Sequence, residues 1–181
     1  MNQENPFKLL SSKEVYKNPW ISVREDSVIR PGGKEGIFGV IDVTDGVTTA
    51  AVTEDNHILM VREWSYGYDG YTLECVSGAI DEDESPINAA KRELQEEAGA
   101  VSHQWESLGA VNSLTTIMDF KSHIFLAREV CIEHPQNPDE GEVIEVVSIP
   151  LEEAVQKINN NEITHDVSIV AILRTYLLLN Q

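Results

Sequence analysis

The feature that most constrains this fold is a helix signal over residues 86–98 whose two faces differ in character. Ser85 is a favoured residue just before a helix, and Pro86 suits the first helical position, where its missing N–H does no harm. Gly99 is placed to end the helix. The residues between are rich in strong helix formers. One face carries a short apolar stripe that can pack on a core, made of Ala89, Ala90 and Leu94.

The other face of this predicted helix carries three glutamates. Glu93, Glu96 and Glu97 are three and four residues apart, so their Cβ atoms lie roughly 5–6 Å from one another on one solvent-facing surface. Like charges at that spacing destabilise a bare helix, and a divalent cation would reverse the sign of the interaction. Oxygen-rich sites suit hard cations such as Mg²⁺ or Mn²⁺. The alternative is an ordinary solvated acidic helix.

The wider stretch from Gly78 to Ala100 favours the metal-binding interpretation. It resembles the Nudix box, G-x5-E-x7-R-E-U-x-E-E-x-G-U, in a loop followed by a helix. The last position of the box is usually a bulky aliphatic residue, and here it is Ala100. This departure affects packing and not the chemistry. The matching residues are Gly78, Glu84, Arg92, Glu93, Leu94, Glu96, Glu97 and Gly99.

The resemblance to the Nudix family implies a role for each matching polar residue. Glu93, Glu96 and Glu97 would be ligands of Mg²⁺ or Mn²⁺, the implied cofactor. A main-chain carbonyl of Ser77 or Gly78 would be a further ligand. The resemblance also places Glu84, Arg92 and Glu96 among the catalytic residues, with Glu84 and Arg92 orienting the ligands. The alternative for Arg92 is an ordinary surface ion pair.

Segments outside the box are similar to the ADP-ribose pyrophosphatase branch of that family. Residues 73–78 resemble its L-E-x-[PV]-A-G lead-in, with Ser77 in place of alanine. The acidic loop at residues 139–142 also resembles that branch, in which a loop glutamate positions or deprotonates the attacking water. Glu140 and Glu142 are both candidates for this role, and we favour Glu140 as the base and Glu142 as an additional metal ligand. The alternative is a solvated loop.

Substrate contacts are expected where Arg62-Glu63-Trp64-Ser65 stands in place of the branch's R-Q-Y-R. Arg62, Trp64 and Ser65 are the candidate substrate-binding residues. Ser65 replaces an arginine, so one charged contact is lost and the choice of sugar stays open. Trp64, Tyr66 and Tyr68 could stack on a base, or could instead pack in the core or an interface.

The predicted fold is α/β, the Nudix α/β/α sandwich with a mixed β-sheet and an N-terminal antiparallel β extension. Residues 1–45 form that extension, and residues 46–181 form the Nudix hydrolase domain. The extension resembles the segment through which the ADP-ribose branch dimerises, so a homodimer is expected. Hydropathy patterns predict strands at residues 20–30, 36–43, 47–52, 58–61, 72–76, 105–112, 122–129 and 143–149. Two more helices are predicted, at residues 150–159 and 166–178.

Composition narrows the possible partners. The 13 basic and 31 acidic residues give a net charge of −18, which repels a nucleic-acid polymer. No apolar run is long enough to span a bilayer, and residues 1–10 lack a signal-peptide core. Cys75 and Cys131 have no CxxC partner and are expected to be reduced thiols. The chain is therefore expected to be cytoplasmic and to bind a small nucleotide, with neither membrane nor nucleic acid as partner.

Together these features predict metal-dependent hydrolysis of the pyrophosphate bond of a nucleoside diphosphate sugar. ADP-ribose, cleaved to AMP and ribose 5-phosphate, is the expected substrate. One alternative is a Nudix hydrolase of nucleoside triphosphates or dinucleoside polyphosphates. Another is a non-catalytic ADP-ribose sensor, which would be expected to lose box glutamates or gain a DNA-binding domain.

Overall fold

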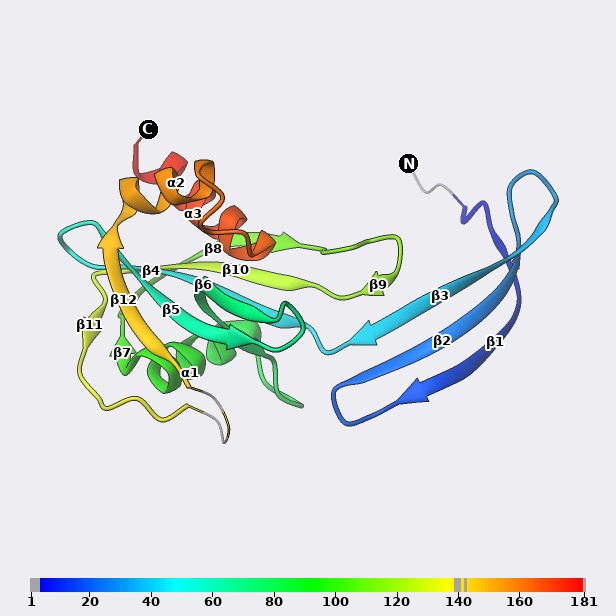
Figure 1. The fold of residues 1–181 in the computed structure, drawn as a ribbon, viewed down its shortest axis with the longest axis horizontal. Helices are drawn as coiled ribbons and strands as arrows, with labels where there is room; N and C mark the ends of the chain where they lie inside the picture. Colours follow the sequence, from blue (N-terminus) through cyan, green and yellow to red (C-terminus); the bar gives the residue numbers. More distant parts are fainter. Residues whose placement is uncertain (1–3, 139–140, 142, 181) are drawn as a thin grey trace. The chain divides into compact units, whose positions relative to one another are not determined.

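The computed structural model describes residues 4–138, 141 and 143–180, and the chain divides into two compact units (Figure 1). The first unit contains residues 1–44 together with residues 112–121. The second contains residues 45–111 and 122–181. The sequence did not indicate that residues 112–121, far along the chain, would join the first unit. None of the helices in the described residues is long and apolar enough to cross a membrane.

The first unit is a sheet in the order β1-β2-β3-β9. Its strands are β1 (Lys8–Lys17), β2 (Ile21–Ile29), β3 (Glu35–Val43) and β9 (Met118–Asp119). The pairs β1–β2 and β2–β3 are antiparallel, whereas β9 runs parallel to β3. Every residue of β1 is exposed. Strand β1 was not predicted, because without a buried face it lacks the alternation that marks a half-buried strand.

The second unit is built on a six-stranded sheet in the order β12-β5-β6-β4-β10-β8. Strand β10 is parallel to β4 and the other pairs are antiparallel, so the predicted mixed sheet is confirmed. The strands are β4 (Gly46–Val52), β5 (His57–Ser65), β6 (Gly70–Ala79), β8 (Gln104–Val111), β10 (Ser122–Arg128) and β12 (Glu145–Pro150). A two-stranded sheet pairs β7 (Ala100–Val101) with β11 (Cys131–Ile132), which are too short to show a pattern.

Helices cover both faces of this sheet, as predicted for an α/β/α sandwich (Figure 1). Helix α1 (Pro86–Ala98) lies on one face, while α2 (Leu151–Asn159) and α3 (Asp166–Leu179) lie on the other. The alternation along β5 explains the two cores. Leu59 and Val61 pack with Leu94 of α1, and Ile58 and Met60 pack with Ala154 and Ile172 of the other two helices.

The ends of α1 follow the expected residues, with one correction. Gly99 adopts the left-handed conformation at φ 62°, and its N–H reaches Gln95 O and Leu94 O. Ser85 stands at the N-cap position, but its side chain makes no capping hydrogen bond within the described part of the chain. Its main-chain oxygen instead accepts bonds from the N–H groups of Asn88 and Ala89.

The start of α3 is bonded to β6. His165 Nδ1 lies 2.8 Å from Glu74 Oε2, and the Ser168 hydroxyl accepts a hydrogen bond of 2.9 Å from Cys75 N. Ser168 Oγ also lies 2.9 Å from His165 Nδ1. Both contacts of the imidazole use the same nitrogen, so this cluster lacks the opposed arrangement of a Ser-His-acid nucleophile. It fastens α3 to the sheet.

Burial and pairing act in opposite directions on this ion pair. Burial favours the neutral form of Glu74, but the hydrogen bond and charge of His165 outweigh it and lower the pKa of Glu74 below 4.5. Burial likewise opposes the charge on His165, and the attraction of Glu74 raises the pKa of His165 above 6.5. Glu74 thus stabilises the fold above its ordinary pKa, and that contribution is lost as the pH falls. His165 stabilises it below its ordinary pKa, and that contribution is lost as the pH rises through its raised pKa.

We therefore expect the pair to stabilise the fold most between the two ordinary values, 4.5 and 6.5. The melting temperature of the wild type should exceed that of His165→Asn by about 2–4 °C near pH 6, if the pair is worth about 1 kcal/mol. The difference should shrink as the pH rises through the raised pKa of His165, where the imidazolium is lost. Thermal melts across this range test it, with the exposed His103→Asn as control. Parallel curves for the wild type and His165→Asn would contradict it.

Candidate active site

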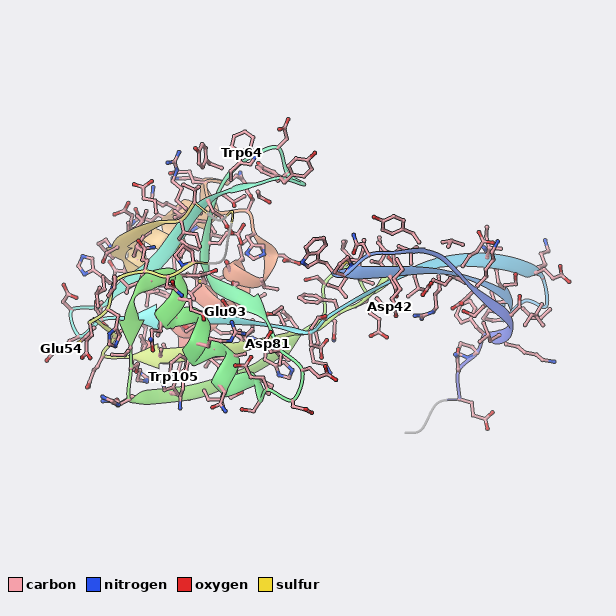
Figure 2. The ribbon with its side chains drawn as sticks, turned by 90° about the horizontal axis from the view of Figure 1, so that it is seen from below. Asp42, Glu54, Trp64, Asp81, Glu93 and Trp105 are labelled. Atoms are coloured by element: carbon pink, nitrogen blue, oxygen red, sulfur yellow. The ribbon has the colours of Figure 1, made fainter. Side chains whose placement is uncertain are left out.

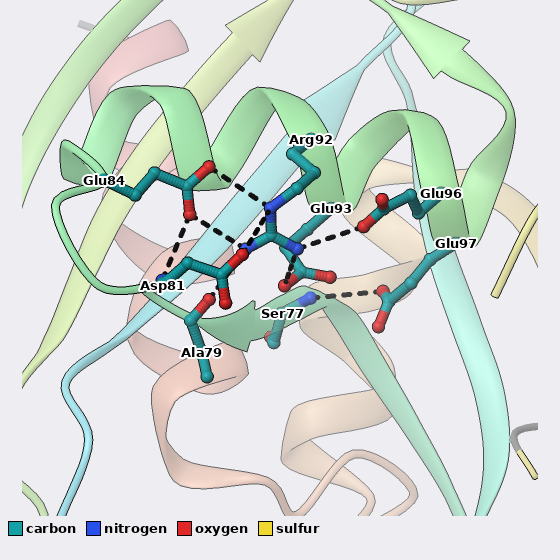
Figure 3. Close-up of polar contacts among 8 residues, drawn as sticks. All are labelled: Ser77, Ala79, Asp81, Glu84, Arg92, Glu93, Glu96 and Glu97. Atoms are coloured by element: carbon teal, nitrogen blue, oxygen red, sulfur yellow. Dashed lines mark hydrogen bonds and ion pairs between the residues drawn. The ribbon is translucent and has the colours of Figure 1, made fainter. Parts of the chain in front are cut away.

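The acidic face of α1 is organised around one guanidinium group (Figure 3). Arg92 donates two hydrogen bonds to the Glu84 carboxylate, at 3.2 and 3.0 Å. Its Nη1 donates to Glu93 Oε1 at 2.8 Å and to Glu96 Oε2 at 3.0 Å, and its Nη2 donates to the carbonyl of Ala79 at 2.9 Å. One cation therefore joins three carboxylates and the end of β6, which is more than an ordinary surface ion pair.

The contacts of Arg92 offset the like-charge repulsion between Glu93 and Glu96. The hydrogen bond to Glu84 is the largest of the effects that raise the pKa of Arg92, and the same bond lowers the pKa of Glu84. The side chains of Arg92, Glu84 and Glu93 are 28%, 17% and 13% exposed, so solvent screens these contacts only in part. Arg92 and Glu84 therefore both stay charged at neutral pH, and the hydrogen bonds of Arg92 hold the carboxylates in fixed orientations.

Glu84 also fixes the loop between β6 and α1. Its carboxylate accepts a hydrogen bond of 3.2 Å from Asp81 N, while its own N–H donates to Asp81 O at 3.0 Å. The Asp81 carboxylate lies 3.8 Å from Arg92 Nε. Asp83 adopts a left-handed conformation at φ 64° within this turn. Asp81 was not among the predicted site residues, because the box pattern leaves that position unspecified.

Gly78 lets the carboxylate of Glu93 rest against the main chain of β6. A Cβ added at Gly78 would lie 1.9 Å from Glu93 Oε1 and 2.1 Å from its carboxyl carbon. No side chain fits there unless Glu93 moves. Glycine is explained here by the close approach of the Glu93 carboxylate and not by its backbone conformation, since its φ does not lie in the left-handed region.

Glu97 lies at the same edge of β6 but is not solvent-facing. Its side chain is buried, with 6% exposure, and its Oε2 accepts a hydrogen bond of 3.3 Å from Ser77 N. The expectation that all three glutamates face solvent was wrong at this position, because Glu97 lies on the side of α1 that folds against the sheet. The bond ties α1 to the residue that precedes Gly78.

The donors at this edge fit a hard divalent cation. Glu93, Glu96 and Glu97 offer carboxylate oxygens, and Ser77 and Gly78 offer main-chain carbonyls, all of them oxygen ligands. Because Gly78 has no side chain, the Glu93 carboxylate lies against that main chain, and we call this space at Gly78 the glycine cradle. Within the described residues no three acidic, histidine or cysteine side chains form a converged metal cluster, and Arg92 engages Glu93 and Glu96 instead.

The predicted base, Glu140, and the predicted additional ligand, Glu142, lie outside the described residues. Two residues that come shortly before them in the sequence are hydrogen-bonded to α1. Asn137 N donates a 2.8 Å hydrogen bond to Glu96 O, and Gln136 Nε2 donates to Glu97 O. Gln136 and Asn137 therefore lie at the carboxyl end of the helix that carries the glutamates.

The predicted substrate-binding residues lie on β5, apart from α1 (Figure 2). Arg62 pairs with Glu145 at 3.1 Å and lies 4.2 Å from the ring centre of Tyr71. Trp64 meets Tyr71 edge to face at 5.2 Å, and Ser65 closes the β5–β6 turn through its carbonyl. Tyr71 is seven residues from Gly78 along β6, which is roughly 23 Å of strand. The structure thus does not bring Arg62, Trp64 and Ser65 together with the box carboxylates.

The aromatic side chains of the β5–β6 hairpin are exposed. Trp64, Tyr66 and Tyr68 are 51%, 93% and 63% exposed, so packing in the core is excluded for them. A neighbouring aromatic, Tyr71, is 58% exposed. Exposed aromatic groups of this kind suit stacking on a ligand or packing in an interface.

Comparison with known proteins covers nearly the whole chain. Residues 7–41 match the nucleoside diphosphate sugar hydrolase N-terminal domain, and residues 44–168 match the NUDIX domain. The chain is 26% identical over 157 residues to an ADP-ribose pyrophosphatase of Bacillus subtilis, covering 86% of this chain and 85% of that protein. It is 25% identical over 166 residues to a methanol dehydrogenase activator of Bacillus methanolicus, covering 91% of this chain and 90% of that protein.

The fold has a close counterpart among solved structures. A crystal structure of an ADP compounds hydrolase superposes with a TM-score of 0.86, covering 99% of this chain and 97% of the other at 20% identity. The NUDIX match spans more than half of the chain, and it contains the loop and helix that Arg92 holds together. This chain belongs to the Nudix family.

Proposed function

We propose that this protein hydrolyses the pyrophosphate bond of nucleoside diphosphate sugars, with ADP-ribose giving AMP and ribose 5-phosphate. The observation that carries the proposal is the set of carboxylates that Arg92 and the glycine cradle hold at the edge of β6. The match of residues 7–41 to the nucleoside diphosphate sugar hydrolase N-terminal domain supports this substrate class. So does the name of the Bacillus subtilis relative.

The residues of this site would hold Mg²⁺ or Mn²⁺ through the oxygens of Glu93, Glu96 and Glu97 and a main-chain carbonyl at Ser77 or Gly78. When bound, the cation neutralises pyrophosphate charge and lowers the pKa of a coordinated water. Arg92 and Glu84 keep the ligand carboxylates oriented, so that little reorganisation accompanies the reaction. Without a counter-ion, this acidic edge would repel the diphosphate.

In the proposed reaction, the oxygen of water forms a bond to one phosphorus and the bridging P–O bond breaks. The leaving phosphate takes the electron pair of that bond, and one proton of the water is removed. We assign that proton to Glu140, with Glu142 as an additional cation ligand. This assignment is supported by the hydrogen bonds of Gln136 and Asn137 to the carboxyl end of α1, since these residues come shortly before Glu140 in the sequence.

Recognition of the rest of the substrate is proposed for the β5–β6 hairpin. Arg62 and Trp64 could contact the part of the substrate that lies away from the cleaved bond, with Trp64 stacking on the base, because both side chains are exposed there. Ser65 offers no charge, so selectivity among sugars should be modest. We further propose that the first unit mediates a homodimer, since β1 is exposed at every position. Two free cysteines are consistent with the proposed cytoplasmic location.

A panel of nucleotides tests the proposed substrate class. ADP-ribose or another nucleoside diphosphate sugar should give a higher kcat/KM than ATP, dGTP or a dinucleoside polyphosphate. Phosphate released by a coupled phosphatase measures turnover, and chromatography identifies the products. AMP and ribose 5-phosphate should appear in equal amounts. A preference for triphosphates, or release of ADP and free ribose, would rule the proposal out. Binding without turnover would favour the sensor alternative.

Replacing Glu97 with Gln tests the role of the buried carboxylate. Glu97→Gln should lower kcat by about two orders of magnitude, or roughly 3 kcal/mol, because one negative ligand is removed. The fold should persist, because the amide oxygen of Gln can still accept the bond from Ser77 N. Steady-state kinetics and thermal melts measure both. The exposed Glu152→Gln, a matched change on α2, should leave kcat unchanged. Near-normal turnover of Glu97→Gln would show that the carboxylate is dispensable.

A further inference from the structure

The main chain of β6 at the candidate site is supported from the opposite face of the sheet by buried hydroxyl groups. Ser77 Oγ lies 3.3 Å from Thr48 Oγ1 on β4, and Thr48 Oγ1 lies 2.9 Å from Ser122 Oγ on β10. Thr48 and Ser122 are both 1% exposed. The three hydroxyls thus link three neighbouring strands, β6, β4 and β10, on the face of the sheet opposite the site.

The hydroxyl of Ser77 connects these contacts to the main chain of β6. Ser77 Oγ donates to the carbonyl of Cys75 at 2.8 Å and, at the longer distance of 3.3 Å, to Thr48 Oγ1. Either hydroxyl can be the donor between Thr48 and Ser122. The series of contacts therefore runs from Ser122 through Thr48 to Ser77 and to a main-chain carbonyl of β6.

Ser77 is the residue through which this support reaches α1. Successive residues of a strand point to opposite faces, so the Ser77 side chain faces away from α1 while its main chain lies at the site. Its N–H donates to Glu97 Oε2, and the next residue, Gly78, is the cradle for the Glu93 carboxylate. A shift of Ser77 would move both contacts. The lead-in of the branch that this chain resembles has alanine here, which could not join such a chain.

We propose that Thr48 and Ser122 are positioning residues for the candidate cation site. They fix the main chain at Ser77 through its hydroxyl, and thereby fix the hydrogen bond to Glu97 and the carbonyls offered at Ser77 and Gly78. The inference rests on the proposed function for its consequence, since it concerns the site that function would use. Neither residue touches substrate or cation, so their effect on turnover is indirect.

The test compares Thr48→Val and Ser122→Ala, which remove the hydroxyls with little change of shape, with Thr48→Ser, which keeps one. In the metal-free protein, hydrogen exchange at residues 76–79 should be about fivefold faster in the first two variants, as expected for one lost hydrogen bond. The affinity for Mn²⁺, measured by titration without substrate, should fall by about 3- to 10-fold. Thr48→Ser should restore both quantities.

Two controls separate positioning from a general loss of stability. Thr175→Val removes a buried hydroxyl for which the described residues offer no hydrogen-bond partner, and Ile163→Val weakens the core on the same side of the sheet. Both should leave exchange at residues 76–79 and Mn²⁺ affinity near those of the wild type. If Thr48→Val and Ser122→Ala behave like these controls, the inference is overturned. Failure of the wild type to bind Mn²⁺ would instead count against the proposed function, while the metal-free exchange still decides the inference.

Discussion

The contacts of Arg92 are the interaction on which the rest of the candidate site depends. Of the three glutamates that would repel one another on the helix, Glu93 and Glu96 are oriented by one guanidinium, and Glu97 is oriented by the main chain of the adjoining strand. Glu84 completes this arrangement by bonding both Arg92 and the loop before α1. The negative charge needed to attract a divalent cation is thus held in place by a counter-charge that belongs to the fold itself.

Close approach between α1 and β6 gives that arrangement its geometry. Gly78 has no side chain, so the carboxylate of Glu93 reaches the main chain of the strand. Glu97 is buried and bonded to Ser77 N, and Ser77 is held from below by Thr48. The site therefore depends on contacts on both faces of the sheet. The carboxylates lie on the face that α1 covers, and the hydroxyl contacts of Ser77 lie on the opposite face.

The sequence predicted those parts whose signals are local. Helix α1 was predicted at residues 86–98 because proline, helix formers and a terminal glycine occur in order, and its glutamates share a face because helix geometry is fixed. The fully exposed strand β1 was missed because it has no buried alternation. The burial of Glu97 and the contacts of Asp81 and Thr48 depend on the meeting of distant segments. No pattern within one segment reports such contacts.

The central claim is that these carboxylates support cation-dependent cleavage of a pyrophosphate bond. The most direct measurement follows ADP-ribose hydrolysis in water labelled with heavy oxygen, first in excess chelator and then with Mg²⁺ or Mn²⁺ added back. Mass spectrometry of AMP and ribose 5-phosphate should show label in one of the two phosphates, and only once free cation is present. Label incorporated at the full rate in excess chelator, or unlabelled products in the presence of the cation, would contradict the claim.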